Sequence, residues 1–428
     1  MAYIPFVVML VALLLGVPIA FSLAVAGIVG IYLHSADWTI VLRILGTTPF
    51  GAVGDYVLTT IPMFILMAYF SASGGLARDL FTAGANFLSS VRGGLAIATV
   101  FACGIFGAMS GASIAAAAVM SSIAMPEMRR HGYSDELAAG SIGIGATLDI
   151  LIPPSVGMVI YGISTQTSIG KLLVAGVVPG CLVAAFLIVA IVVWVRISPS
   201  HAPETYTVPH RERWASVLRI WPSLVLIVLV VALLYLGVAT PTEVGALGAF
   251  FAGVIGMAMG RLTWAGAFEA VRQTIKTSAL IFMILIGATI FGYYMAMSQI
   301  PQHVVAAVTA LELNRWVVMI GIIVAYFVVS MFMDELPLLL LTLQLTFPLI
   351  VSLGFDPIWF GVVSMLMVAM GLVFPPVGMI AFVVSSSARV GLVKVYTGTS
   401  ILMVALIATT ALVMVFPQIV LWLPNSMR

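Results

Sequence analysis

Apolar segments long enough to cross a membrane recur along the whole chain, and few charges interrupt them. One of them, "VPIAFSLAVAGIVGIYL" at residues 17–33, contains no Asp, Glu, Lys or Arg. A helix needs about 20 predominantly apolar residues to cross the hydrocarbon core of a bilayer. Of the 428 residues, 63% are hydrophobic and 7% are charged, whereas soluble domains carry about 25% charged residues. This composition excludes a soluble globular protein.

The spanning segments are predicted to be helices. Strands of a membrane barrel alternate in polarity over about ten residues, and these segments do not alternate. Because every backbone polar group must be satisfied inside lipid, helices are the other structure that can span a bilayer. The chain is therefore predicted to be an all-α polytopic membrane protein.

The apolar segments fall into two series separated by one long polar connector, residues 196–219. The first series lies at about 3–15, 18–33, 56–74, 94–125, 138–163 and 172–195, and the second at about 220–237, 243–260, 277–298, 317–352, 358–386 and 396–423. The predicted organisation is a first repeat over 1–195 and a second repeat over 220–428.

A shift of 222 residues aligns the two series. It places Met125-Pro126 on Phe347-Pro348 and Pro153-Pro154 on Pro375-Pro376. After one extra residue at Ser155, the sequence Val-Gly-Met continues in both copies. One offset that holds over some fifty residues indicates an internal duplication.

Two segments, 94–125 and 317–352, are too long for one span and short for two. Each has a small or polar middle, "GAMSGAS" in the first and "MDELP" in the second. We interpret both as re-entrant helical hairpins, whose tips must be buried in protein or line a wet cavity. The following segments, 138–163 and 358–386, each contain a Pro-Pro pair and are predicted to be broken helices.

The basic residues indicate how the repeats are oriented. If both hairpins return to the side they enter from, thirteen of the seventeen Lys and Arg share a side with the connector 196–219. The positive-inside bias makes that side cytoplasmic and places the C-terminus in the periplasm. Residues 126–136 carry Arg129 and Arg130, whereas their repeat partners 348–358 carry neither Lys nor Arg. The repeats are therefore predicted to be inverted, as is common in secondary transporters.

Such a duplication concentrates function near the midplane, at the hairpin tips and broken helices. The first tip offers Ser110, Gly111 and Ser113, and the second offers Asp334 and Glu335. An intramembrane carboxylate is expensive and indicates function by default. The alternatives are small-residue helix packing at the first tip and simple solvation of the second tip at an aqueous mouth.

The broken helices are the other candidates. A Pro-Pro pair removes backbone donors and frees carbonyl groups of the preceding turn. In the first break, side-chain oxygens of Thr147, Asp149 and Ser155 lie near these carbonyls, and the second break offers the carbonyls of Gly371, Val373 and Phe374. Such oxygen ligands suit a hard cation such as Na⁺. The alternative is a purely structural kink.

None of these four elements contains Lys or Arg. An anionic substrate would have to be held by helix N-termini, hydroxyl groups and bound cations, which is a physical reason for coupling to Na⁺. The candidate substrate-binding residues are Ser110, Gly111, Ser113, Asp149, Pro153, Ser155 and Pro376.

Other classes of function find little support in the sequence. It contains no Walker, HExxH or GxSxG motif, so neither ATP binding nor enzymatic activity is expected. An aspartyl pair of Asp149 and Asp334 in an intramembrane enzyme, and an open channel, are weaker alternatives. The net charge of +2 does not indicate nucleic-acid binding, and Cys103 and Cys181 indicate no disulfide framework.

Long strings of the sequence resemble one known family. The strings "GAMSGASIAAAAVMSSIAMPEMRRHGYSDELAAGSIGIGATLDILIPPSVGM", "LGVATPTEVGALGAFFAGVIG" and "FPPVGM" look like the large membrane (M) subunit of tripartite ATP-independent periplasmic (TRAP) transporters. The resemblance covers essentially the whole chain. It implies a multi-pass protein of the bacterial inner membrane with an elevator-type fold, in which a transport domain slides against a scaffold.

The resemblance also implies partners and cargo. Such subunits work with a small four-helix membrane (Q) subunit and a periplasmic substrate-binding protein, and import organic anions such as C4-dicarboxylates or sialic acid with Na⁺. Because the chain begins directly with the large-subunit pattern, the small subunit is expected to be a separate chain. A self-sufficient Na⁺/organic anion symporter of the same architecture is the alternative.

The sodium sites that the resemblance implies agree with the candidates above. The first would combine Ser110 and Ser113 with carbonyls from Gly145 to Ile150. The second would combine Asp334 with carbonyls from Gly371 to Pro375. Two repeats imply two or more Na⁺ ions.

Overall fold

A computed structural model describes residues 3–202, 205 and 207–427. Within these residues, helices are the regular secondary structure and no strand occurs. Six of the described helices are long and apolar enough to cross a membrane, or seven if the pair α12–α13, bent by 43°, counts as one span. The prediction of an all-α polytopic membrane protein is therefore confirmed in its fold class.

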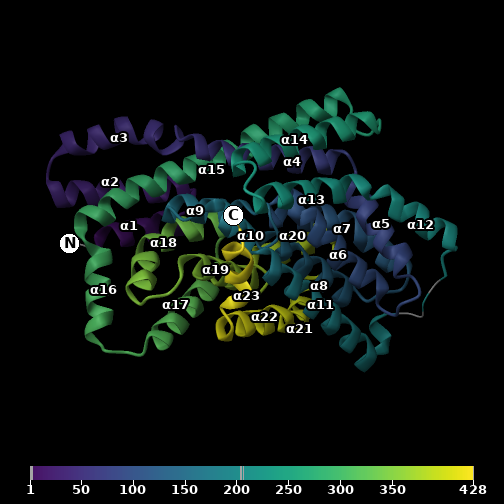
Figure 1. Ribbon diagram of the computed structural model, residues 1–428. Helices are drawn as coiled ribbons and strands as arrows, with labels where there is room; N and C mark the ends of the chain where they lie inside the picture. The colour runs from purple at the N-terminus through teal and green to yellow at the C-terminus, as the bar shows by residue number, and fades with distance from the viewer. Residues whose placement is uncertain (1–2, 203–204, 206, 428) are drawn as a thin grey trace.

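An outer layer of helices lies along one side of the molecule (Figure 1). Its members pack pairwise, α2 and α4 against α15 and α4 against α14, and α1 packs on α2. They are α1 (Ile4–Leu14), α2 (Ile19–Ser35), α3 (Trp38–Val53), α4 (Thr60–Ser73), α14 (Pro241–Ala258) and α15 (Trp264–Ser298).

Glycines allow the backbones of α2 and α15 to approach each other closely in this layer. A Cβ atom at Gly287 of α15 would lie 2.1 Å from the carbonyl oxygen of Ala20 on α2. A Cβ atom at Gly27 of α2 would lie 2.8 Å from the backbone of Ile290, and one at Gly30 would lie 2.4 Å from the Tyr294 ring. Small residues let membrane helices pack backbone to backbone, so α2 and α15 form a tight pair.

An inner group contains the hairpins, the broken helices and one helix that packs on them. The first hairpin is α6 (Gly94–Ser110) and α7 (Ser113–Arg130), and the second is α17 (Arg315–Ser330) and α18 (Glu335–Ser352). The broken helices are α8 (Asp135–Ala146) with α9 (Val156–Thr165), and α19 (Pro357–Gly371) with α20 (Met379–Ala388); α21 (Leu392–Leu402) follows them.

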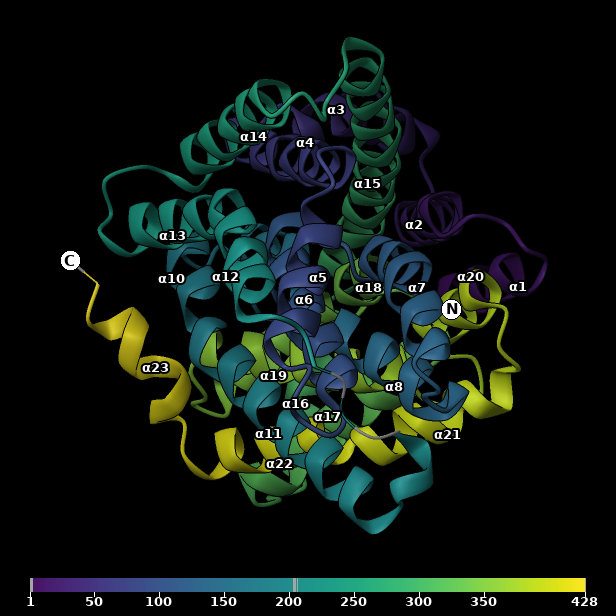
Figure 2. The same cartoon turned by 90° about the vertical axis from the view of Figure 1, so that its right-hand side faces the viewer.

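The remaining helices complete the molecule, with α13 and α23 at the left of the view turned by 90° (Figure 2). They are α5 (Leu76–Phe87), α10 (Ile169–Ala175), α11 (Val177–Ile197), α12 (His210–Arg219), α13 (Trp221–Tyr235), α16 (Ile300–Ala310), α22 (Val404–Val415) and α23 (Gln418–Asn425).

The helix interruptions occur where the sequence predicts them. At the first tip, Gly111 has φ +57°, a left-handed conformation that glycine adopts without steric cost. In the first break, α8 ends at Ala146, a 3₁₀ turn covers Thr147–Ile150, and the prolines precede α9. Both Pro-Pro bonds, Pro153-Pro154 and Pro375-Pro376, are cis.

The two hairpins and two broken helices pack in a reciprocal pattern. The first arm of each hairpin packs on the first half of the broken helix that follows it, α6 on α8 and α17 on α19. The second arm packs on the second half of the other broken helix, α7 on α20 and α18 on α9. The candidate sites thus lie where the two halves of the chain meet.

Several helices differ from the segments expected from hydropathy, and among them α5 and α16 lie wholly between expected segments. Helix α3 was not expected, because Arg43, several threonines and Pro49 lower the apolar content of residues 38–53. Helix α15 begins at Trp264 instead of near 277, since its first turns are amphipathic rather than apolar. The polar connector 196–219 contains α12, which packs on α5.

Candidate functional site

Asp149 is the most deeply buried carboxylate at the first break. It is 1% exposed. Its Oδ1 accepts a hydrogen bond of 2.7 Å from Ser113 Oγ at the first hairpin tip. Its Oδ2 is buried and has no hydrogen-bond partner among the described residues. A buried charge without a partner is costly, so this oxygen has unused capacity for a cation.

The first tip lies directly against this break because two glycines leave room for it. A Cβ atom at Gly107 would lie 2.6 Å from the Asp149 Cβ. A Cβ atom at Gly111 would lie 2.8 Å from the carbonyl oxygen of Pro154. Any larger side chain would push the tip away from the carboxylate, so these glycines set the distance between Ser113 and Asp149.

The second tip brings two more carboxyl groups toward Asp149. Glu335 is 5% exposed, and its buried Oε2 has no hydrogen-bond partner among the described residues. A Cβ atom at Gly157 of α9 would lie 3.4 Å from the Glu335 carboxyl carbon. Asp334 is half-buried at the start of α18. Asp149 lies within electrostatic range of Asp334, and Glu335 lies within electrostatic range of both.

The second tip is hydrogen-bonded to the second break. The backbone N–H of Gly378 donates to the carbonyl oxygen of Met331 at 3.0 Å. Ser330 Oγ donates to the carbonyl oxygen of Phe327 at 2.9 Å and lies beside Gly371. A Cβ atom at Gly371 would lie 1.8 Å from that hydroxyl oxygen, so only glycine fits at this contact.

Helix α21 satisfies carbonyl groups that the second Pro-Pro pair leaves free. Thr399 Oγ1 donates to the carbonyl oxygen of Val373 at 3.0 Å. The Tyr396 hydroxyl lies 3.1 Å from the carbonyl oxygen of Pro376 and 2.6 Å from that of Val377. The carbonyl of Val373, predicted as an ion ligand, therefore already accepts one bond. Phe374 packs its ring against Phe327, with ring centroids 5.4 Å apart.

The hydroxyl groups predicted at the first break and tip also have local backbone partners. Thr147 Oγ1 donates to the carbonyl oxygen of Ile144 at 2.8 Å, and Ser110 Oγ to that of Gly107 at 3.4 Å. Ser155 Oγ accepts from the Met158 N–H at 3.3 Å and caps α9. Each hydroxyl oxygen can still face an ion with a lone pair.

Three further predicted positions lie at the edges of these contacts. Gly145 packs against Cys103, whose sulfur would lie 3.1 Å from an added Cβ. Pro153 is buried, whereas Pro376 is exposed. The first break is thus enclosed, whereas part of the second break lies at the surface of the molecule.

The sequence interpretation missed Ser330, Tyr396 and Thr399. Ser330 directly precedes the second tip, so its position in the sequence could have identified it as a candidate site residue. Tyr396 and Thr399 lie on another helix, and their contacts depend on tertiary packing alone. No group of three or more His, Cys, Asp or Glu side chains within residues 3–202, 205 and 207–427 is arranged to hold a metal ion, so a cation here would depend on hydroxyl and carbonyl oxygens as well.

Comparison with known proteins identifies the family. The model of the family described as "Tripartite ATP-independent periplasmic transporter, DctM component" matches residues 6–419. The chain belongs to this family. The resemblance to TRAP large subunits is thereby confirmed.

Individual relatives of this DctM-family chain cover almost its full length. The C4-dicarboxylate TRAP transporter large permease of Pseudomonas aeruginosa is 34% identical over 405 residues, 94% of each chain. The sialic acid TRAP transporter large permease of Vibrio cholerae is 30% identical over 415 residues, 96% of this chain and 95% of its own. The crystal structure of the Alcanivorax borkumensis YdaH transporter shares the fold, with a TM-score of 0.64 and 15% identity over 90% of this chain and 89% of that one.

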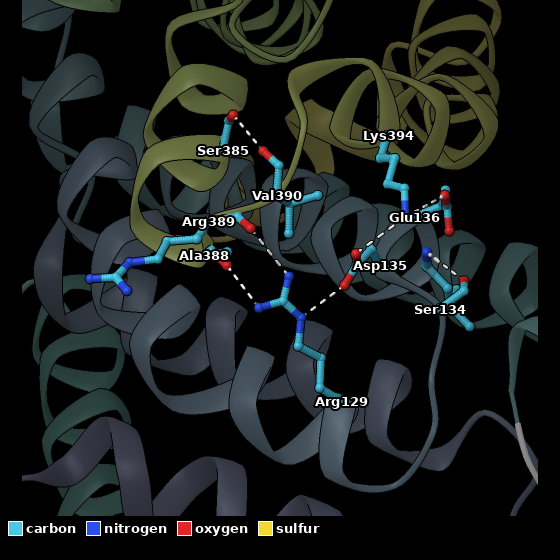
Figure 3. Close-up of polar contacts among 10 residues, drawn as sticks. Arg129, Ser134, Asp135, Glu136, Ser385, Ala388, Arg389, Val390 and Lys394 are labelled. Atoms are coloured by element: carbon cyan, nitrogen blue, oxygen red, sulfur yellow. Dashed lines mark hydrogen bonds and ion pairs between the residues drawn. The ribbon is translucent and has the colours of Figure 1, made fainter.

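A network of charged and polar groups connects the C-terminal ends of α7 and α20 with the first turns of α8 and α21 in this DctM-family chain (Figure 3). Arg129, at the end of α7, donates to Asp135 Oδ1 at 2.8 Å and to the carbonyl oxygens of Ala388 and Arg389 at 3.1 and 3.3 Å. Lys394 of α21 lies 3.3 Å from Asp135 Oδ2 and 3.6 Å from Glu136 Oε1. The network joins the first hairpin to both broken helices.

Replacing Arg129 by glutamine is expected to lower the melting temperature of the detergent-solubilised protein at pH 7, a loss of about 1 kcal/mol. The hydrogen bond from Arg129, more than that from Lys394, lowers the pKa of Asp135 below its ordinary value of 3.8, against an opposing effect of burial. The ionised Asp135 therefore stabilises the fold above pH 3.8, and this contribution is lost as the pH falls below that value.

The difference in melting temperature between Arg129→Gln and the native protein should consequently be smaller at pH 3 than at pH 7. Arg130→Gln is the matched control, because the Arg130 side chain is 79% exposed and lies 3.9 Å from Glu127. An equal difference at both pH values, or an equal effect of the control, would contradict a role for the Arg129–Asp135 pair.

Proposed function

We propose that this DctM-family chain is the subunit through which an organic acid crosses the bacterial inner membrane together with Na⁺. The observation that carries the proposal is the buried Asp149 carboxylate, which contacts the first hairpin tip through Ser113 and retains an unpartnered oxygen. Such a group is expensive inside a membrane protein and marks an ion pathway. The description of the family as ATP-independent supports an ion gradient as the source of energy.

Two sodium positions are proposed, one at each pair of tip and break. The first surrounds Asp149 with oxygens of Ser110, Ser113, Gly145 and Thr147. The second draws on Asp334, Glu335 and the carbonyls of Gly371, Val373 and Phe374. Organic acid would bind between them, at Ser110, Gly111, Ser113, Asp149, Pro153, Ser155 and Pro376. The cations would offset the negative charge that both the site and the acid carry.

The proposed substrate is a carboxylic acid of the C4-dicarboxylate or sialic acid type. The C4-dicarboxylate and sialic acid permeases of Pseudomonas and Vibrio, to which the chain is similar, support this choice. The word "tripartite" in the family description supports two further components. We propose that these are a small four-helix membrane (Q) subunit and a periplasmic binding protein that delivers the acid.

The proposed mechanism is an elevator movement of the inner group against the outer layer, with inverted repeats. The reciprocal packing of α6, α7, α17 and α18 on the broken helices supports a pseudo-symmetric transport unit. The tight pair of α2 and α15 supports a rigid scaffold. At their boundary, Gln344 of α18 donates one hydrogen bond of 2.9 Å to the carbonyl oxygen of Ala288 on α15, a contact that sliding would break.

Uptake into proteoliposomes tests the function. We expect vesicles with this chain, its small subunit and the loaded binding protein to accumulate succinate or N-acetylneuraminate under an inward Na⁺ gradient. Equal uptake after replacement of Na⁺ by K⁺ would overturn sodium coupling. Equal uptake by this chain alone would instead favour a self-sufficient symporter.

A further inference from the structure

A cavity of about 520 Å³ separates the outer layer from the second hairpin tip. One wall is formed by the start of α2 and by α15, and the opposite wall by the start of α18. Most of its lining is apolar, and two lining residues carry opposite charges, Lys276 on α15 and Asp334 at the tip. We call this cavity the Lys276 groove; its lining residues are Pro18, Ile19, Ala20, Phe21, Lys276, Ala279, Leu280, Met283, Ile284, Asp334, Leu336 and Pro337.

Lys276 reaches this groove from outside the predicted site. It lies three turns into α15, beyond the exposed pair Glu269 and Arg272, which are 3.5 Å apart. Lys276 itself forms no ion pair with a residue that the structure describes. A lysine can extend its apolar stem along an apolar surface and direct the ammonium group to a polar one. Its charge is therefore free to meet a ligand in the groove.

The hairpin tips and the Pro-Pro breaks contain neither Lys nor Arg. A carboxylate that leaves them through a mostly apolar groove would lose its hydration without a partner, which is costly. Asp334 alone would repel it. Lys276 is the cationic side chain in the lining of this groove, and its charge complements that of an organic acid.

We propose that Lys276 binds the carboxylate of the transported acid on the outer-layer side of the groove. This inference rests on the proposed function and adds a specificity residue to it. When the tip lies at its present position, the acid would contact Lys276 on one wall while Asp334 faces its cation on the other. Since α15 belongs to the outer layer, movement of the inner group would bring the acid to Lys276 and carry it away again.

Transport kinetics test the proposal in the complete three-component system. Lys276→Gln should raise the KM for succinate or N-acetylneuraminate about tenfold, as expected for loss of a charged hydrogen bond, and leave the Na⁺ concentration for half-maximal rate unchanged. Lys276→Arg should retain most of the affinity, because it keeps the charge. Arg272→Gln, one turn away and outside the groove lining, is the matched control. A KM equal to the native value in Lys276→Gln would overturn the inference.

A second measurement needs no transport. In a Cys181→Ser background, which removes the exposed thiol and leaves Cys103 buried, Ala279→Cys places a thiol in the groove. The ratio of its reaction rates with an anionic and a cationic methanethiosulfonate should fall about fivefold when Lys276→Gln is added. It should not fall with Arg272→Gln.

The two measurements separate failure of the inference from failure of the proposed function. Uptake by the native complex could be independent of Na⁺ while Lys276→Gln still lowers the ratio of anionic to cationic reagent rates. In that case sodium coupling is wrong, and Lys276 still selects anions in the groove. If uptake follows Na⁺ but neither the KM nor the ratio responds to Lys276→Gln, the inference about Lys276 is wrong and the proposed function stands.

Discussion

Asp149→Asn is expected to reduce Na⁺-dependent uptake by about 100-fold or more. Asparagine keeps the size of the side chain and an oxygen that can accept the 2.7 Å bond from Ser113, so the contact between tip and break survives. What is lost is the negative charge that would hold a cation at the buried Oδ2. Removing one partner of a buried ionic interaction costs about 3–5 kcal/mol, and 100-fold corresponds to about 2.7 kcal/mol.

The measurement is the initial rate of uptake in proteoliposomes as a function of Na⁺ concentration. Yield and monodispersity of the purified protein report on folding, and both should match the native protein. Asp37→Asn is the control: Asp37 caps α3 with an exposed carboxylate, and asparagine is an equally good cap. Native uptake in Asp149→Asn would exclude this carboxylate from the ion site.

Asp334→Ala is expected to abolish uptake while the protein still folds and inserts into the membrane. Asp334 makes no side-chain capping bond to α18, so its removal deletes little of the local structure. Its carboxylate lines the Lys276 groove and lies within electrostatic range of Asp149. Because intramembrane carboxylates are retained where they act on ions or substrates, the loss should appear in transport rather than in stability.

A matched control for this variant lies on the same half of the chain. Asp356 is exposed and caps α19 through the N–H groups of Ile358 and Trp359, and Asp356→Asn should transport normally. Uptake by Asp334→Ala at the native rate would remove Asp334 from the site. Loss of protein from the membrane fraction would show that Asp334 is needed for folding, contrary to the prediction.

The helical membrane architecture could be predicted because its signals are local. Apolar length determines a span, and the positions of Gly111 and of the two Pro-Pro pairs mark where helices end. The exceptions have local reasons as well. Arg43 and Pro49 lower the apolar content of α3, and charged residues lower that of the first turns of α15, so hydropathy did not predict these helical residues. The sequence therefore predicted where the chain breaks better than where each helix begins.

The candidate site could be predicted only in part. The sequence by itself determined which residues are able to bind an ion, since Ser113, Asp149 and Asp334 are polar groups in apolar segments. Tertiary structure decided which of them meet: Ser113 and Asp149 are 36 residues apart and share a hydrogen bond, and Thr399 of α21 occupies the carbonyl of Val373. It also placed Lys276 and Asp334 in the lining of one groove. The reason is physical: helix ends follow from the backbone preferences of neighbouring residues, whereas contacts between helices depend on packing across the whole chain.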